Sequence, residues 1–284
     1  MEIRKILVAT DFSDEAYNAL FNATQIWAMQ ECTFYILNVY DEATPLTGTH
    51  KVPLMGKKKL EKLQKESVEG LTKISHRITL DTGNENHTYH TISKRGTLAT
   101  VIPKTVQNLA IDLVVMGNKG KTGAKEIFMG SNTLKVAGSI HQCPLLAIPK
   151  GIDYKPQNNI AFVTDYKKGC NAKTLAPLLS VATTTKAPIN VMHIASEEKL
   201  DAVQISNQKL LEICLKDVEH SFHQVLEFDD KAKVIDSFIE THSITMLAMV
   251  YMKRSFMERL LREPVIKDIS LYAKSPFLIL PMRE

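Results

Sequence analysis

The chain has 284 residues, a length that suits two domains of average size better than one. Hydrophobic residues make up 44% of it and charged residues 23%, as in an ordinary globular protein with a sizeable core. The formal net charge is only +4 and the lysines are scattered, which argues against the concentrated basic face typical of nucleic-acid binding.

No apolar run reaches the length of a membrane span, and a charged N-terminus leads directly into the first predicted strand without a signal peptide. The four cysteines lie far apart and include no CxxC pair, which is typical of reduced cytosolic thiols and not of a disulfide framework or a zinc site. We therefore expect a cytoplasmic protein with no membrane partner and no bound metal site of its own.

The first half of the chain alternates predicted strands with predicted helices. An apolar strand over 3–10 ends at Asp11-Phe12-Ser13, and Ser13 is a suitable N-cap for a helix over about 14–29. The further predicted elements are strands over 33–39, 87–93, 111–116 and 145–149, and helices over 57–79, from Gly96-Thr97 to about 109, and from Ser131 through the pattern at 134–140. Such alternation predicts a parallel sheet with helices on both faces.

The longest predicted loop runs from Tyr40 to Gly56 and contains Pro45 and Pro53. Uncommitted loops of this length are unusual in compact domains and are often functional. A lid over a binding site, a dimer contact and a disordered excursion are all open interpretations of this segment.

The segment from Met116 to Thr133 joins the strand over 111–116 to the next helix. It follows the carboxyl end of a strand, where open α/β sheets bind ligands. Four small residues set its spacing: Gly117, Gly120, Gly130 and Ser131. Glycine lets backbone N–H groups approach a ligand closely, and Ser131 stands where a helix begins and its dipole favours an anion. The pattern predicts a site for a phosphate chain.

Two other interpretations of this segment are open to the sequence. Gly120-Lys121-Thr122 looks like the end of a Walker A loop, but that motif needs a glycine five residues before Gly120, where Val115 stands. The following Gly123 also interrupts the helix that a Walker loop requires. A glycine-rich surface loop without a ligand is the second alternative.

The spacing of Gly117, Gly120, Gly130 and Ser131 resembles the G-x2-G-x9-G-[ST] signature of the ATP-binding branch of the universal stress protein family. The resemblance implies a doubly wound α/β domain of the adenine nucleotide alpha hydrolase-like class, with strand order 3-2-1-4-5. It also implies an adenine nucleotide as the ligand, ATP with or without Mg²⁺.

The resemblance further implies which residues line the nucleotide crevice. They are Ala9, Thr10, Asp11, Val39, Met116, Gly117, Gly120, Gly130, Ser131, Asn132 and Thr133. Asp11 would repel a triphosphate unless it binds a divalent cation or accepts a hydrogen bond from the ribose or base. Its alternative role is to cap the first helix, and both roles can hold together. The chain departs from the family by carrying Ala9 where proline is common and Asn38 where histidine is frequent.

The second half repeats the first. Residues 159–165, 187–194, 244–250 and 276–281 echo four strands of the first half in the same order, which indicates a tandem duplication. We predict a universal stress protein domain with the nucleotide-binding loop over 1–150 and a degenerate one over 151–284. Residues 250–264, opposite the glycine segment, contain no glycine, so the second domain is predicted not to bind ATP in this way and to be structural or dimer-forming.

The sequence shows no catalytic constellation beside the phosphate segment. We therefore expect an ATP-binding, nucleotide-responsive stress-tolerance or regulatory protein, not an enzyme, with at most weak hydrolysis. Its assembly would be an intramolecular pairing of domains or a homodimer. Two alternatives stay open. One is a slow ATPase or adenylyl-transferring enzyme of the same fold, although the serine- and glycine-rich loop of ATP pyrophosphatases is missing after the first strand. The other is a ligand-free dimerisation scaffold.

Overall fold

The computed structural model describes residues 4–41, 56–118, 130–156, 158–195, 199–226, 231–251 and 275–282. Three predicted features lie outside the described residues. They are Gly120 with its neighbours, most of the 40–56 loop, and the glycine-free segment of the second half after residue 251.

The described residues of the first half form five strands and four helices in the alternation that the sequence predicts. The strands are β1 (Arg4–Ala9), β2 (Cys32–Tyr40), β3 (His87–Arg95), β4 (Leu113–Gly117) and β5 (Leu145–Ile148). The helices are α1 (Asp14–Ile26), α2 (Lys57–Thr82), α3 (Leu98–Leu109) and α4 (Ser131–Ala137). The first helix ends earlier than predicted, because the backbone leaves the helical conformation at Trp27, which is fully buried, and the following turn leaves Met29 89% exposed.

The described part of the second half follows the same plan. Its strands are β6 (Ile160–Thr164), β7 (Ile189–Ala195), β8 (His220–Leu226), β9 (Met246–Tyr251) and β10 (Phe277–Pro281). Its helices are α5 (Ala172–Thr185), α6 (Ala202–Leu215) and α7 (Lys231–Thr241). The sequence did not predict β8, which lies at the edge of the sheet. An edge strand stays partly exposed and carries polar residues such as Ser221 and Gln224, so it lacks a continuous apolar signal.

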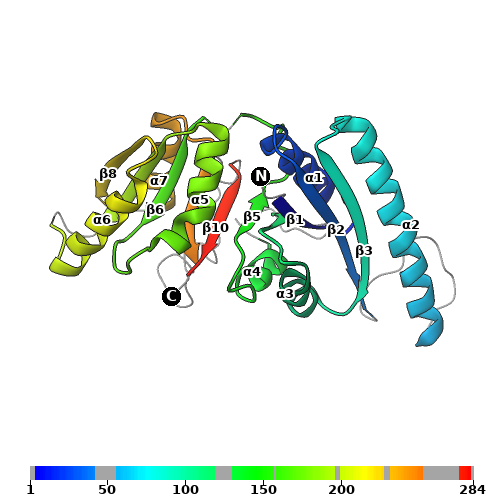
Figure 1. Cartoon of the computed structure of the whole chain (residues 1–284). Helices are drawn as coiled ribbons and strands as arrows, with labels where there is room; N and C mark the ends of the chain where they lie inside the picture. The colour runs from blue at the N-terminus through cyan, green and yellow to red at the C-terminus, as the bar shows by residue number, and fades with distance from the viewer. Residues whose placement is uncertain are drawn as a thin grey trace.

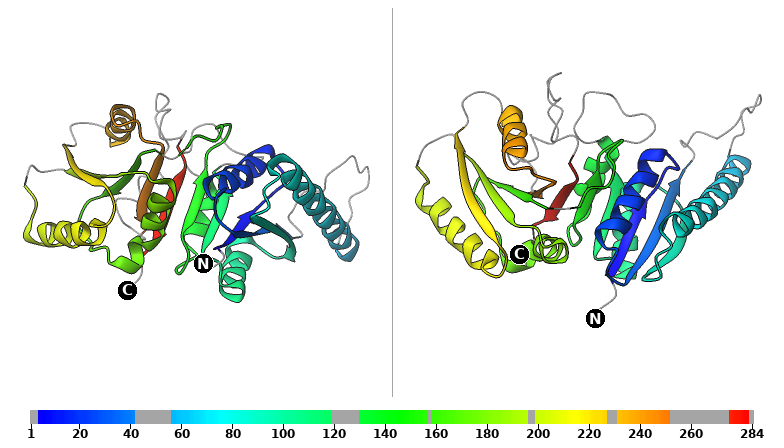
Figure 2. Two further views of the ribbon diagram at one scale, coloured as in Figure 1. Left: turned by 45° about the horizontal axis from the view of Figure 1, so that its top comes forward. Right: turned by 90° about the horizontal axis from the view of Figure 1, so that it is seen from above.

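The ten strands formed by the described residues make one sheet in the order β3-β2-β1-β4-β5-β10-β9-β6-β7-β8 (Figure 1). Within each half the neighbouring strands are parallel and follow the predicted order 3-2-1-4-5. The halves meet at their fifth strands, β5 and β10, which lie side by side at the centre of the molecule (Figures 1 and 2). This pair is antiparallel, with Leu278 opposite Leu146.

The core forms two layers, one on each face of the sheet. On β1, Val8 packs in the layer that contains Leu20 of α1, whereas the adjacent Leu7 packs in the layer that contains Ile102 of α3. Successive side chains of a strand point to opposite faces, so a strand covered on both sides must be apolar throughout. This doubly wound arrangement leaves the carboxyl ends of the parallel strands β1, β2 and β4 along the same side of the sheet, at the ends of the strands.

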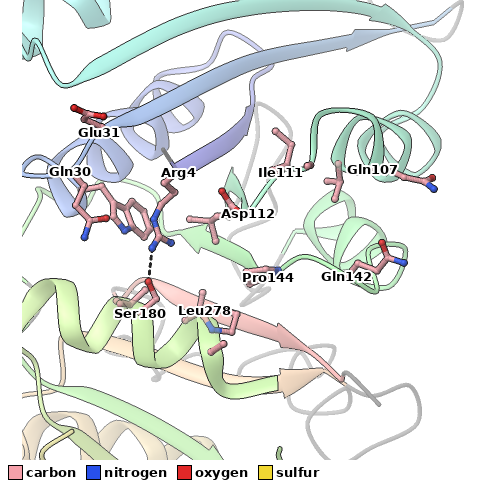
Figure 3. Close-up of a pocket in the computed structure, with 17 residues that line it drawn as sticks. Arg4, Gln30, Glu31, Gln107, Ile111, Asp112, Gln142, Pro144, Ser180 and Leu278 are labelled. Carbon is pink, nitrogen blue, oxygen red and sulfur yellow. Dashed lines mark hydrogen bonds between the residues drawn. The ribbon is translucent and has the colours of Figure 1, made fainter. Parts of the chain in front are cut away.

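Side chains also join the two halves on the opposite side of the sheet, where β1 begins. Arg4 Nη2 at the start of β1 donates a hydrogen bond to Ser180 Oγ of α5 at 2.5 Å (Figure 3). Gln30 Nε2 donates to Thr184 Oγ1 of the same helix at 2.9 Å. Among the described residues, no helix is both long and apolar enough to cross a membrane.

Candidate functional site

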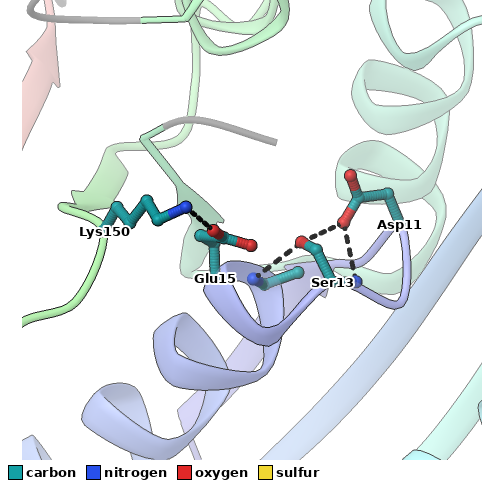
Figure 4. A network of polar contacts seen from close by, with 5 residues as sticks. Asp11, Ser13, Glu15 and Lys150 are labelled. Atoms are coloured by element: carbon teal, nitrogen blue, oxygen red, sulfur yellow. Dashed lines mark hydrogen bonds and ion pairs between the residues drawn. The ribbon is translucent and has the colours of Figure 1, made fainter. Parts of the chain in front are cut away.

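The carboxyl end of β1 continues into a tight turn that contains two of the predicted site residues. Thr10 Oγ1 accepts a hydrogen bond from the Phe12 N–H at 3.0 Å. Asp11 Oδ1 accepts from the Ser13 N–H at 3.1 Å and from Ser13 Oγ at 2.5 Å (Figure 4). Phe12 has a φ of 64°, a conformation rare for a residue with a side chain, which the two side-chain hydrogen bonds around it support.

Asp11 acts on the first helix through Ser13. Ser13 Oγ accepts from the Ala16 N–H at 3.2 Å and is the N-cap of α1. The Asp11 carboxylate therefore orients the capping hydroxyl, but the N-cap itself is Ser13 and not Asp11. Asp11 is itself exposed, so this contact is compatible with a ligand role as well.

Buried Asn38 ties the end of β1 to β2. Its Nδ2 donates to the Thr10 carbonyl at 2.8 Å, and the Thr10 N–H donates to the Leu37 carbonyl at 2.9 Å. The next residue, Val39, points to the other face, because side chains alternate along a strand. Asn38 thus holds the two strand ends in place from inside the core.

A cavity of about 420 Å³ lies at the carboxyl ends of β2 and β3, beside α4. Val39 and Asn132, two predicted site residues that are far apart in the sequence, both line it. Its volume falls in the range of small-molecule sites, roughly 300–1,000 Å³. Asp41 and Lys135 place one charge of each sign on its wall.

The segment from Gly96 to Ala99 also lines this cavity, and the sequence had assigned it only a structural role. The Gly96 N–H donates to the Tyr40 carbonyl at 2.9 Å, and Gly96 has a φ of 141°, which glycine adopts without strain. Thr97 caps α3 in a capping box with Thr100. The signal that was available is the strand order: β3 neighbours β2, so the residues after both strands reach the same edge.

Hydrogen bonds bring the start of α4 to the end of β4. The Gly130 N–H donates to the Asn118 carbonyl at 2.8 Å, and Thr133 Oγ1 donates to the Gly117 carbonyl at 3.2 Å. The Asn118 N–H in turn donates to the Ile148 carbonyl of β5 at 2.7 Å. These contacts fold the ends of the glycine segment back onto the sheet edge.

Gly117 has a packing reason to be glycine. A Cβ there would lie 3.2 Å from the Glu15 carbonyl oxygen and 3.4 Å from the Glu15 carbonyl carbon. The missing side chain therefore lets the first turn of α1 pack closely against β4. The sequence had attributed this glycine to a phosphate approach alone, and the two reasons are compatible.

Strand pairing brings the remaining predicted residues to the same edge. Ala9 and Met116 are buried among apolar side chains, so a ligand would meet them through their backbone. Thr133 is buried, and the exposed Ser131 begins α4. Gly120 lies outside the described residues, and its place in the site stays a prediction.

The second half repeats the turn after β1 with different surroundings. Tyr166, equivalent to Phe12, has a φ of 54°, and its N–H donates to Thr164 Oγ1 at 3.1 Å. Its ring stacks on His193 at 4.5 Å between ring centroids. Two amides of α6 hold this turn, since Gln204 Nε2 donates to the Asp165 carbonyl and Asn207 Nδ2 to the Tyr166 carbonyl. Side chains of α6 thus bind the backbone of the turn after β6.

An ion pair joins the first turn of α1 to a residue just after β5. Lys150 Nζ lies 2.5 Å from Glu15 Oε1 (Figure 4). The hydrogen bond from Lys150 is the main reason why the pKa of Glu15 falls below its ordinary value. Glu15 therefore stays ionised in the first turn of α1, where the helix dipole favours an acid.

Comparison with known proteins finds relatives of the first half of the chain. A family model described as "Universal stress protein family" matches residues 2–149 of the chain. The chain is 32% identical over 149 residues to a universal stress protein of Methanocaldococcus jannaschii, covering 52% of this chain and 82% of that protein. It is 29% identical over 148 residues to the universal stress protein YxiE of Bacillus subtilis, covering 51% of this chain and 97% of that protein.

A solved structure extends the likeness in fold to the whole chain. A universal stress protein from Archaeoglobus fulgidus superposes with a TM-score of 0.70 at 14% identity, covering 99% of this chain and 97% of that one. At this identity the match concerns the fold alone. The family match over the first half and the shared architecture lead to one conclusion: the chain belongs to the universal stress protein family.

Proposed function

We propose that the first half binds ATP, with or without Mg²⁺, and that the protein acts as a nucleotide-responsive stress-tolerance or regulatory protein. The observation that carries the proposal is the cavity that Val39 and Asn132 both line, at the carboxyl ends of β2 and β3. Family membership supports it, as does the general rule that open α/β sheets bind ligands at the carboxyl ends of their strands.

The described residues suggest how the nucleotide would be divided over the edge. The base would meet the backbone at Val39 and the apolar side chain of Leu98. Asp11 would face the ribose or a divalent cation, because it cannot face phosphates unaided. The phosphates would lie between Gly117 and Ser131, at the segment with the family spacing.

The absence of enzymatic activity is part of the proposal. Among the described residues that line the cavity, the ionisable ones are Asp41, just after β2, and Lys135 of α4. General acid–base catalysis needs such a group within hydrogen-bond reach of the reacting atom. A phosphate-release assay that measured turnover well above background would support the alternative, a slow ATPase of the same fold.

Calorimetric titration with ATP, with and without Mg²⁺, tests the site. Gly117 is a poor test position because a side chain there would also disturb α1. Gly130→Leu is better, since Gly130 has a φ of −59° that other residues adopt readily. Ala99→Phe would fill the cavity from the first turn of α3, and Ala172→Phe in the first turn of α5 is its matched control.

We expect Gly130→Leu and Ala99→Phe each to weaken ATP binding by about tenfold or more, and Ala172→Phe to leave it unchanged. Unchanged affinity in both test variants would refute the site. No measurable binding by the native protein, with no nucleotide in its mass spectrum after native purification, would favour a ligand-free scaffold. The antiparallel pairing of β5 with β10 is the observation that makes that second function worth testing.

A further inference from the structure

A second cavity, of about 700 Å³, lies between the two halves at the edge of the sheet opposite the crevice (Figure 3). The start of β1 and the ends of α1 and α3 form one wall, and α5 with β10 forms the other. Ligand sites often occur at domain interfaces, in cavities of roughly 300–1,000 Å³. This cavity and the one proposed for the nucleotide share no lining residue, so they are separate sites.

Arg4 is the dominant polar group in this cavity. Its guanidinium donates to Ser180 Oγ and lies 5.5 Å from the centroid of the Trp27 ring. Its Nε is buried and makes no hydrogen bond, and no carboxylate among the described residues forms an ion pair with Arg4. A part-buried cation to which the described residues supply no counter-ion is costly, so this position favours an anion.

The two carboxylates in the lining do not fill that role. Asp112 Oδ2 accepts from the Lys5 backbone N–H at 2.8 Å. Glu31 contributes its backbone carbonyl, which accepts from the Arg4 N–H at 3.2 Å. Both residues are exposed at the rim, where water and salt screen their charge.

The remaining walls combine apolar surface with side-chain amides. Leu113, Pro144 and Leu278 are buried apolar residues that border the space. Gln107 and Gln142 add exposed amides at its mouth. An amphipathic occupant would therefore find an apolar surface for its body and a cation for its acidic end.

From this arrangement we infer that the cavity is a second ligand site, specific for a compact organic anion with an apolar body, whose acid group pairs with Arg4. The same chemistry is offered by a carboxylate and by a phosphate monoester. Occupancy would link the halves, because Arg4 and Ser180 come from different halves and both line the cavity.

The chain carries its own reporter for this site. Trp27 is the single tryptophan, it lines the cavity, and the Arg4 guanidinium lies over its ring. A ligand that pairs with Arg4 changes the environment of the indole and so its fluorescence. Suitable probes are adamantane-1-carboxylate, adamantyl phosphate and the neutral adamantane-1-carboxamide, because none of them absorbs light at the wavelengths where tryptophan absorbs and emits.

Two variants and two controls complete the experiment on the full chain. Arg4→Gln removes the charge, and Arg77→Gln is its control, because Arg77 also lies over an aromatic ring, that of Tyr17, away from the cavity. Ala176→Phe fills the cavity from an exposed position on α5, and Ala172→Phe on the same helix is its control. Thermal unfolding of each variant verifies that it is folded.

We expect at least one anionic probe to change the Trp27 fluorescence in a saturable way. Its affinity should fall by about tenfold or more in Arg4→Gln and in Ala176→Phe, and should equal that of the native protein in both controls. The preferred anion then identifies the acid group as carboxylate or phosphate. Equal binding of the carboxamide, or unchanged anion binding in Arg4→Gln or Ala176→Phe, would refute the inference, as would no response to any probe. ATP affinity should be native in Arg4→Gln, so this site and the crevice are tested separately.

Discussion

Asn38 and His193 make the same hydrogen bond from equivalent positions in the two halves. Asn38 Nδ2 donates to the Thr10 carbonyl at 2.8 Å, and His193 Nδ1 donates to the Thr164 carbonyl at 3.1 Å. In both cases the side chain comes from the second strand of its half and holds the end of the first strand. The duplication therefore preserves the bond while the residue type differs.

This relationship predicts a pH effect. Burial lowers the pKa of His193 from its ordinary value of 6.5, and the hydrogen bond to Thr164 offsets this only in part. The folded state prefers the neutral ring, so its contribution to stability is complete above the unfolded pKa and is lost as the pH falls below it. We expect urea denaturation to show a falling free energy of unfolding from about pH 7.5 to about pH 5.

His193→Asn should make that fall shallower, by up to about 1.4 kcal/mol per pH unit, because it supplies the bond found at Asn38 without a titrating ring. Some slope should persist, since burial also lowers the pKa of His87 and of His223. His76→Asn, at an exposed position on α2, is the control. An identical slope in the native protein and in His193→Asn would contradict the prediction.

The contact between Phe12 and Gly70 predicts that a Gly70 substitution changes the free energy of unfolding in opposite directions with and without the Phe12 ring. A Cβ at Gly70 would lie 2.7 Å from the nearest atoms of the Phe12 ring. Alanine favours a helix over glycine by about 1 kcal/mol, but displacing a packed ring costs about 1–3 kcal/mol. Gly70→Ala should therefore destabilise the native protein and stabilise a Phe12→Ala variant. Chemical denaturation of the four proteins measures both effects, and the same sign in both backgrounds would rule out this explanation.

Lys150 and Glu15 predict a loss of stability that depends on pH. The lowered pKa of Glu15 means that its contribution is present above the unfolded pKa, ordinarily 4.5, and is lost as the pH falls. Lys150→Met should lower the free energy of unfolding at neutral pH, and the loss should be smaller at about pH 3, because Glu15 loses its charge as the pH falls through its lowered folded pKa. Lys173→Met on α5 is an exposed control. An equal loss at both pH values would indicate that the ion pair is not the cause.

The Tyr17 hydroxyl is predicted to stabilise the packing of α1 against α2. Its hydroxyl donates to Asp81 Oδ2, and Arg77 lies 3.7 Å from the centroid of its ring. Burial, together with Asp81, raises the pKa of Tyr17, so the hydroxyl keeps its proton at neutral pH. Tyr17→Phe should cost about 1 kcal/mol of unfolding free energy at pH 7. In an Asp81→Asn background the cost should be smaller, and an undiminished cost there would disprove the charge-assisted bond.

Much of the fold follows from local signals. Buried parallel strands such as β4 and β6 are short apolar runs, and their alternation with amphipathic helices predicts a doubly wound sheet. The strand order 3-2-1-4-5 came from the family resemblance, and the structure confirms it. The edge strand β8 escaped prediction because its short run, His220–Leu226, mixes polar and apolar residues, whereas β3 at the other edge of the sheet was predicted.

The candidate site was predictable only in part. Val39 and Asn132 followed from the family pattern and do line a common cavity, whereas Gly96 to Ala99 were missed although they border it. Those residues look like any helix start in the sequence, and only strand order shows that β3 ends beside β2. Likewise, no pattern could show that Gly117 also makes room for the backbone of Glu15.

By itself, then, the sequence determined the two copies, the strand and helix alternation and the turn after each first strand, because apolar periodicity and capping residues act over a few neighbouring positions. The tertiary structure alone decided that β5 pairs with β10, and that Arg4 meets Ser180 beside a cavity. Apolar runs such as Leu145–Ile148 carry no information about their partner or its direction. Those depend on which sheet edges and helix ends the rest of the chain brings together in space.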